Sequence, residues 1–484
     1  MAPTNPLEIQ EIIDLVASYV DIKDLTTCIR VSKNWYDTFL PHVWRVVRAG
    51  LNVDDYGVDH PIGPKRDAID DHRHLIQDLT LVKKIGGFNK YQYPNMHRLA
   101  VYMNESRAHH SRLFMNLTTK APMLVDLTLS GGYIPSIFWI ALSKHPHLKH
   151  LSLAHLTFKA DDALRLWRTC MNLESLQMRV VVVQRRDRPP RNMVFDRLRQ
   201  LTYIGATWLD GSFFLDIVVQ SPRLESLELT AYGHWIFLDP PTAIGDWPYL
   251  KKVFISGWKE DTNMDFIFKR VGQGQQNTVG MEGASHSGLG TQQAMVFGSH
   301  FNALVDVDLL TTWATSRSII PDILCLCPIL ERLLAKRVFA RSVAERGPWV
   351  CRHLRELRIQ FVFDEGEQDL QPQMFERLST LVRLERLTLN YDYSSHRDTY
   401  YGVLECRLDR GLGQLAKLQQ LTSIRLYTPK SYWRNPHLGM EEVEWILENW
   451  KKLKLIKGKL TDDEELRIQL WNVFESHGIA VEKS

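Results

Sequence analysis

The sequence predicts an α/β protein, in which a three-helix module precedes a repetitive array that forms a curved parallel sheet with outer helices. Three observations lead to this prediction. Capping residues and apolar residues at helical spacing fill the first 48 positions, the spacing L-x-x-L-x-L recurs over most of the remaining chain, and helical patterns stand between these segments. The 484 residues exceed the roughly 250–300 at which a single hydrophobic core stops growing, so we expect an elongated array or several domains.

The first helix has a start signal at Asn5. Asn5 is a favourable N-cap residue, Pro6 suits the first helical position, and Glu8 can reach back to the Asn5 amide. Apolar residues follow at helical spacing: Ile9, Ile12, Ile13, Val16 and Val20. Leu7, Leu15 and Tyr19 lie off this stripe, so apolar side chains cover more than one face of the helix.

Two more helices are expected in the same segment, with Asp21 and Ser32 as their caps. Their apolar residues are Leu25, Cys28, Ile29, Trp35, Tyr36 and Phe39. Three short helices of about 45 residues bury little surface on their own. The excess apolar surface indicates that the module docks on a partner.

These residues resemble an F-box, the helical module by which F-box proteins bind a Skp-type adaptor and join a cullin-based ubiquitin ligase. The resemblance rests on the residue types and spacing of Pro6, Glu8, Ile9, Ile12, Val20, Asp24, Leu25, Cys28, Val31, Ser32, Trp35 and Trp44. It implies adaptor contacts at Pro6, Leu7, Ile9, Ile12, Leu25, Cys28, Val31, Ser32, Trp35 and Trp44. The chain departs from the family at Asn5, where a leucine is usual. The alternative is that the segment only caps the following domain.

The recurring spacing predicts one strand per unit. Its first positions advance by 24 to 26 residues through Leu124, Leu148, Leu173, Leu198, Leu224 and Leu250, which lies in the range of leucine-rich repeats. The second and third apolar positions point inward and the residues between them outward, a period of two. Helical patterns occupy 134–144, 162–169, 213–220, 319–326, 374–381 and 441–448. The chain therefore resembles a leucine-rich-repeat solenoid, whose units stack to share one core.

The expected domain order follows from these patterns. The helical module covers 1–50, a linker 51–72, the solenoid 73–460, and a capping helix with a tail 461–484. Residues 272–293 are rich in Gly and Gln and poor in large apolar residues, which predicts a mobile loop. Thr461 to Glu464 resembles a capping box at the start of the last helix.

The outward strand positions become more basic in the second half of the array. Those expected to bind a substrate are Arg332, Lys336, Arg358, Arg386, Arg425 and Tyr427. An arginine fork matches carboxylate and phosphate groups, so we expect an acidic or phosphorylated protein segment there. The alternative is that these are solvated charges without a partner.

Catalytic and metal-binding motifs are absent from the sequence. It has no phosphate-binding loop, no nucleophile elbow, no H-E-x-x-H and no paired CxxC, and the adjacent His109 and His110 do not suffice for a metal site. Cys170 and Cys406 have no motif that supports a thioester nucleophile. We therefore expect no cofactor and no chemistry by the chain itself, and an enzyme with an unfamiliar site is the rival interpretation.

Charge and hydropathy limit the cellular locations and the classes of partner that we expect. Lys and Arg number 59 and Asp and Glu 56, a net charge of +3 that does not favour nucleic-acid binding. The basic run at 185–191 is expected to be an exposed loop. No secretory signal and no apolar stretch of membrane-spanning length is present, so a cytoplasmic or nuclear protein without a membrane partner is expected, with its six cysteines reduced.

Together, the two resemblances imply a substrate-recognition subunit of a Skp/cullin/F-box ubiquitin ligase, acting in ubiquitin-dependent protein degradation. The F-box would bind the adaptor, and through it a cullin, while the repeats hold a protein substrate of unknown identity. Such a subunit acts by proximity and needs no acid, base or nucleophile of its own. The alternative is a leucine-rich-repeat interaction scaffold outside any ligase.

Overall fold

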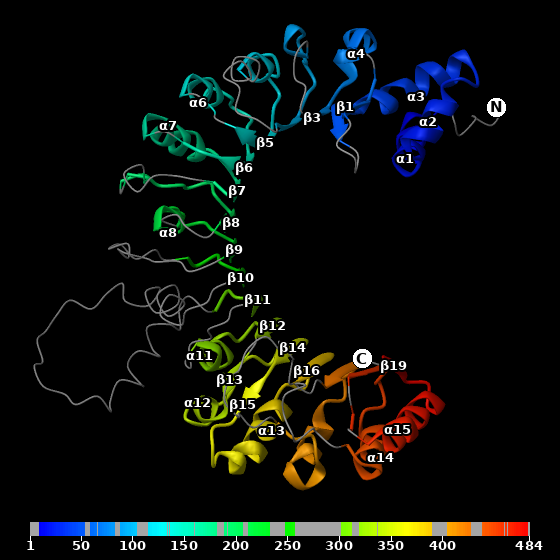
Figure 1. The fold of residues 1–484 in the computed structure, drawn as a ribbon, viewed down its shortest axis with the longest axis vertical. Helices are drawn as coiled ribbons and strands as arrows, with labels where there is room; N and C mark the ends of the chain where they lie inside the picture. The colour runs from blue at the N-terminus through cyan, green and yellow to red at the C-terminus, as the bar shows by residue number, and fades with distance from the viewer. Residues whose placement is uncertain are drawn as a thin grey trace, which may run out of the picture. The chain divides into compact units, whose positions relative to one another are not determined.

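The computed structural model describes most of the chain (Figure 1). The chain divides into two compact units. The described residues are 9–53, 59–64, 66–82, 88–103, 115–132, 134, 136–158, 160–181, 188–190, 192–206, 212–232, 247–256, 302–311, 319–335, 337–389, 404–426, 438–458, 460–461 and 463–482. The N-terminal unit comprises Met1–Leu198 and Tyr203–Gly205, and the C-terminal unit Arg199–Thr202 and Ala206–Ser484. The predicted loop at 272–293 lies outside the described residues.

The N-terminal helical module consists of α1 (Gln10–Tyr19), α2 (Ile22–Cys28) and α3 (Lys33–Arg45). Both inner caps are confirmed, because the Asp21 carboxylate accepts from the Lys23 amide at 3.4 Å and the Ser32 hydroxyl from the Trp35 amide at 3.2 Å. The predicted continuous helix from Asn5 is wrong. Ile9 is the N-cap residue with an extended backbone, φ −92° and ψ 114°, and its carbonyl accepts the first helical hydrogen bonds.

The sheet of the N-terminal unit begins directly after α3. Its strands are β1 (Val46–Val53), β2 (Asp59–Ile62), β3 (Asp78–Val82), β4 (Arg98–Tyr102), β5 (Asp126–Gly132), β6 (His150–Leu156) and β7 (Ser175–Arg179). β1 pairs with β2 antiparallel and with β3 parallel, and β3 to β7 pair in chain order, all parallel. The register aligns Leu79, Leu99, Leu127, Leu151 and Leu176 in one inward row.

Residues 51–72 differ from the predicted linker. They contain the end of β1, the strand β2 and helix α4 (Arg66–His72), which continues into the 3₁₀ helix η2 (Arg73–Leu75). Val47 and Ala49 of β1 are buried, which makes β1 the first strand of the array. Other helices among the described residues of this unit are η3 (Phe88–Lys90), the helical residues 115–119, α6 (Ser136–Leu142) and α7 (Ala160–Cys170). Figure 1 shows α6 and α7 on the same side of the strands.

Strand β8 (Gln200–Ala206) contains residues of both units. In the C-terminal unit the strands are β9 (Ser226–Tyr232), β10 (Lys252–Ser256), β11 (Asp306–Thr311), β12 (Arg332–Ala335), β14 (Glu356–Ile359), β16 (Arg386–Leu389), β17 (Ser423–Leu426), β18 (Leu455–Gly458) and β19 (Ala480–Glu482). Each pairs parallel with the next. β10 pairs directly with β11, although residues 257–301 separate them in the sequence.

Helices precede or follow these strands and cover one side of them (Figure 1). They are α8 (Ser212–Val219), α11 (Ile319–Leu326), α12 (Ala340–Ala344), α13 (Gln371–Ser379), α14 (Met440–Asn449) and α15 (Glu464–Ser476). The described residues of this unit also form three 3₁₀ helices, η5 (Gln368–Leu370), η6 (Leu408–Arg410) and η7 (Leu412–Lys417), and the short strand pair β13 (Val338–Phe339) and β15 (Phe361–Val362). No helix in the described ranges is long and apolar enough to cross a membrane.

The core confirms the leucine-rich-repeat architecture. The inward strand positions are buried in every repeat, as in β3, where Leu79 and Leu81 are 0% exposed and their neighbours are half-buried. Helices close the other side of the core with large rings, among them Trp139, Trp167 and Phe375. Burial of one such leucine stabilises the fold by about 1.5–3 kcal/mol relative to exposure, and each repeat needs its neighbours to achieve it.

The C-terminal end closes with a helix and a strand. The Asp463 carboxylate accepts from the Leu466 amide at 3.0 Å and caps α15, so the predicted cap at Thr461 is wrong by two residues. The chain then turns back, and β19 adds to β18. Three residues with a single large apolar side chain, Val481, are too short a pattern to predict a strand.

Candidate functional site

The helical module has a small core. Its buried side chains are Ile13, Ala17, Leu25 and Phe39, and five partly buried residues pack on them: Val20, Cys28, Ile29, Trp35 and Val43. Trp35 meets Phe39 edge to face, with ring centroids 5.5 Å apart. His42 Nε2 lies 3.0 Å from Asp14 Oδ1 and connects α3 to α1. This core holds the three helices together but leaves much apolar surface uncovered.

The uncovered apolar side chains of the module form its most distinctive feature. The large hydrophobic residues that are exposed in 9–46 are Ile9 (39%), Leu15 (58%), Val16 (37%), Tyr19 (85%), Ile22 (52%), Val31 (63%), Tyr36 (39%) and Val46 (54%). No other stretch of this length in the described residues carries as many. Scattered exposed hydrophobic residues are ordinary, but a concentration of them marks an interaction surface.

Helix α1 has two apolar faces. Ile13 and Ala17 point into the module core, whereas Ile12, Leu15, Val16 and Tyr19 stand at the i, i+3, i+4 and i+7 spacing of a separate face. Leu15, Val16 and Tyr19 of that face are exposed. The second face is apolar without being part of the core, which fits a surface that a partner covers.

The residues predicted to contact the adaptor divide into three groups. Ile9, Val31 and Ser32 are exposed, and Ile12, Cys28, Trp35 and Trp44 are half-buried. Leu25 is only 4% exposed, because its side chain fills the module core, so it can affect docking only through the fold of the module. Pro6 and Leu7 lie outside the described residues.

Six exposed apolar residues of this set were not predicted as contacts from the sequence: Leu15, Val16, Tyr19, Ile22, Tyr36 and Val46. A signal for two of them was present, since Leu15 and Tyr19 lie off the main apolar stripe of α1. An apolar residue outside the stripe that forms the core has no partner within the module, and that property distinguishes contact residues from core residues.

The module is joined to the repeats without a flexible linker. Val46 is both the C-cap residue of α3 and the first residue of β1, and the Gln77 amide donates to the Arg45 carbonyl at 3.0 Å. The Trp44 ring packs against the ring of His72 of α4, with centroids 4.6 Å apart and the ring planes tilted by 37°. Burial lowers the pKa of His72 below its ordinary value, although the nearby Asp71 acts in the opposite direction. The lowered pKa favours the neutral ring. A protein bound to α1–α3 would therefore be held in a defined orientation to the first repeats.

The strand face of the C-terminal unit carries a row of alternating charge. The register aligns Asp306, Arg332, Glu356 and Arg386 on neighbouring strands. Arg332 lies 2.9 Å from Asp306 (Nη1 to Oδ1), 3.4 Å from Asp308 (Nη2 to Oδ2) and 3.6 Å from Glu356 (Nε to Oε2). Arg386 Nη2 lies 2.7 Å from Glu356 Oε2. Arg332 and Arg386, two of the four arginines predicted to bind a substrate, are thus already balanced by carboxylates.

The other predicted substrate-binding residues fall in or beside a second row. Arg358 and Arg425 are half-buried, and the register places Thr388 between them and Lys457 next to Arg425. Lys457 forms an ion pair with Glu482 of β19. Lys336 and Tyr427 lie outside the described residues. The strand face is therefore polar and carries both positive and negative charges, so it is not uniformly basic.

The cysteines lie mainly in the core. Cys170, Cys327, Cys351 and Cys406 are buried and Cys28 and Cys325 half-buried. Burial raises the pKa of the Cys406 and Cys351 thiols to about 12, and it raises those of Cys170 and Cys327 as well. With a pKa of about 12, roughly one thiol in 10⁴ is ionised at pH 8, and the thiolate is the nucleophile. This environment disfavours Cys170 and Cys406 as acceptors of ubiquitin.

Alkylation of the folded chain with iodoacetamide at pH 8 tests this environment. We expect the four buried cysteines to remain unlabelled while the protein is folded and all six to react in guanidinium chloride, as read by peptide mass spectrometry. Because burial raises the pKa of each of these thiols, protection should decline only at a pH well above the ordinary thiol range or when the fold opens. Rapid labelling of Cys170 or Cys406 in the folded chain would contradict the account.

No metal centre is visible in the parts of the chain that the structure describes, since no group of three or more His, Cys, Asp and Glu residues is arranged to hold an ion there. His109 and His110 lie outside those parts. The candidate functional surfaces are consequently the apolar surface of the module and the polar surfaces of the repeats.

Comparison with known proteins gives no relative in sequence and weak likenesses in structure. No family model matches the chain, and no curated protein matches it. An internalin (inlF) from Listeria monocytogenes is 11% identical, over 87% of this chain and 89% of that chain, with a TM-score of 0.38. The match in the yeast Rad7 and Elc1 complex is 12% identical, over 86% of this chain and 86% of that chain, with a TM-score of 0.37. The match in the TLR13–ssRNA13 complex is 12% identical, over 89% of this chain and 66% of that chain, with a TM-score of 0.36. Likenesses this low carry no inference about function.

Proposed function

We propose that the chain is the substrate-recognition subunit of a Skp/cullin/F-box ubiquitin ligase. In this proposal α1–α3 dock on a Skp-type adaptor, which connects them to a cullin, and the leucine-rich repeats hold the protein to be ubiquitinated. The observation that carries the proposal is the set of exposed apolar side chains in 9–46, on a module whose sequence resembles an F-box.

The way the module is attached supports a positional role. Of the three helices, α3 makes the substantial contacts with the repeats, through β1 and η2, while α1 and α2 pack mainly on α3. A module that served as a cap would be expected to lay its apolar faces on the array. Here the second apolar face of α1 remains uncovered, as a docking role requires.

The proposed mechanism needs no chemistry from this chain. Holding a substrate beside a ubiquitin-carrying enzyme converts a bimolecular encounter into an effectively intramolecular one, which can contribute about 7–11 kcal/mol to lowering a barrier when the geometry is favourable. The direct connection of α3 to β1 keeps that geometry defined at the adaptor end. The protonated, buried thiols of Cys170 and Cys406 fit a subunit that accepts no ubiquitin itself.

Co-expression of the full chain with a Skp-type adaptor tests the proposal. We expect the two proteins to co-purify in equal amounts through an affinity step and size-exclusion chromatography. Recovery of the folded chain alone would contradict it, and the protein would then be a leucine-rich-repeat scaffold outside the ligase.

A further inference from the structure

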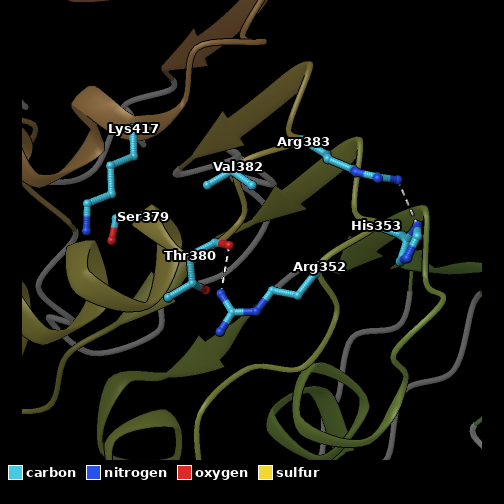
Figure 2. Close-up of a pocket in the computed structure, with 7 residues that line it drawn as sticks. All are labelled: Arg352, His353, Ser379, Thr380, Val382, Arg383 and Lys417. Atoms are coloured by element: carbon cyan, nitrogen blue, oxygen red, sulfur yellow. Dashed lines mark hydrogen bonds between the residues drawn. The ribbon is translucent and has the colours of Figure 1, made fainter.

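We propose that a basic pocket formed by the turns of three successive repeats binds a phosphorylated serine or threonine of a protein partner. The pocket is a cavity of about 430 Å³ in the C-terminal unit, lined by Arg352, His353, Ser379, Thr380, Val382, Arg383 and Lys417 (Figure 2). None of these residues was a sequence-based candidate, because each comes from a turn or a helix end rather than from the strand face.

The turns and helix ends of the repeats determine the positions of the basic residues in the pocket. Arg352 and His353 form the turn before β14, Val382 and Arg383 the equivalent turn before β16, and Lys417 ends η7 in the following repeat. Residues that are about 30 positions apart in the sequence therefore meet because the repeats stack. Figure 2 shows Arg352 reaching toward Thr380, Arg383 beside His353, and Lys417 next to Ser379.

Hydrogen bonds hold the two arginines in place. Arg352 Nη1 donates to the Thr380 carbonyl at 2.8 Å, at the end of α13. Arg383 Nη1 lies 3.0 Å from His353 Nδ1, and because a guanidinium has no acceptor, the arginine donates and the ring nitrogen accepts. Each guanidinium has five N–H groups, so one such bond positions it and leaves most of its donors for a ligand.

The charge of this pocket differs from that of the strand face. Arg332 and Arg386 are balanced by carboxylates, whereas within the described residues Arg352, Arg383 and Lys417 form no ion pair, and no acidic side chain lines the cavity. Ser379 and Thr380 donate their hydroxyl hydrogens to the carbonyls of Glu376 and Arg377. Three positively charged side chains of the pocket are therefore available to bind one anion.

The size and lining of the pocket indicate which anion it fits. A phosphoryl group carries a charge of about −1.5 to −2 and three acceptor oxygens, which suits three cations better than a single carboxylate does. The exposed Val382 side chain supplies an apolar contact for the peptide that carries the phosphate. The lining contains no Phe, Tyr or Trp on which a nucleic-acid base could stack, which favours a peptide over RNA.

This inference deepens the proposed function by naming the class of partner that the repeats bind, and it rests on that proposal only for the ligase role. Peptide binding is measured without an adaptor, and adaptor binding is measured without a peptide. A chain that binds the adaptor but no phosphopeptide contradicts only the pocket assignment. A chain that binds phosphopeptides but no adaptor contradicts only the ligase assignment.

The test uses the full chain and beads that carry degenerate peptides with a central phosphoserine or phosphothreonine, beside the same peptides without phosphate. The pocket variant carries Arg383→Glu and Lys417→Glu, which leaves the Arg352 bond to Thr380 intact. The control variant carries Lys451→Glu and Lys452→Glu, two exposed turn residues outside the pocket with the same change of charge. Melting temperatures of all proteins check folding, and Arg383→Lys with Lys417→Arg keeps the charges.

We expect phosphopeptide beads to retain the wild type, the pocket variant to bind at least about tenfold more weakly, and the control and charge-keeping variants to bind as the wild type. Retention should weaken in high salt and in the presence of inorganic phosphate. Equal binding to unphosphorylated peptides, equal binding by the pocket variant, or no binding by the wild type would overturn the proposal. So would an inositol polyphosphate or RNA that binds through the pocket when the phosphopeptides do not.

Discussion

Replacing Ile9 and Val31 together by Asp is expected to reduce the affinity for a Skp-type adaptor by at least about 100-fold. Their side chains are 39% and 63% exposed, so the module core does not depend on them. In the docked state each new carboxylate would be buried against an apolar surface without a partner, at a cost of several kcal/mol. Since every 1.4 kcal/mol is about a factor of ten, two such changes should abolish co-purification.

The matched control for this double variant lies on α6. Ile137 and Ile140 are 55% and 41% exposed, outside the helical module, and Ile137→Asp with Ile140→Asp makes the same chemical change. We expect this variant to bind the adaptor as the wild type does. If both double variants bind equally well, or if both lose binding, the apolar surface of 9–46 is not the docking surface. Circular dichroism of both proteins ensures that folded chains are compared.

Gly458→Ala is expected to destabilise the C-terminal repeats by about 3 kcal/mol or more. Gly458 ends β18 with φ +114°, a backbone conformation that residues with a Cβ rarely adopt. A Cβ at this position would also overlap the carbonyl oxygen of Leu426, its register partner on β17. Strain and lost pairing then act together at the strand on which β19 is built.

Urea denaturation and limited proteolysis measure this effect. Because repeat arrays can unfold in parts, protease cleavage near the C-terminus reports the loss of β18 and β19 directly. Gly347→Ala is the control, since a Cβ there meets no atom within 4 Å. We expect its stability to stay within about 1 kcal/mol of the wild type. Equal behaviour of the two variants would show that the close approach at Gly458 is not required.

The sequence predicts the repeats well because the same pattern of apolar residues recurs in each repeat, and that pattern marks the side chains that the repeats bury. Most strands carry two inward apolar residues, commonly leucines, and each stacked neighbour needs the same pattern to bury them. The caps at Asp21 and Ser32 are predicted for a similar reason, because the bond from the side chain to the nearby amide is local. Features that depend on distant contacts are missed, namely the pairing of β1 with β2 and the addition of β19.

The functional surfaces are predicted less well than the fold. The F-box resemblance mixes core residues such as Leu25 with exposed ones such as Val31, and only the packing of the module separates them. The carboxylates that balance Arg332 come from residues 24 and 26 positions away, on a neighbouring strand. The basic pocket draws on the turns of three repeats. In the last two cases the deciding neighbours are distant in sequence, so no local pattern could identify them.

The most direct test of the central claim is the mass of the particle that the full chain forms with a Skp-type adaptor, measured by light scattering during size-exclusion chromatography. The account predicts a complex of one chain and one adaptor for the wild type and for the α6 control, and a free chain for the Ile9→Asp, Val31→Asp variant. A wild-type chain that elutes alone at micromolar concentrations of adaptor would contradict the claim that residues 9–46 dock this protein into a ubiquitin ligase.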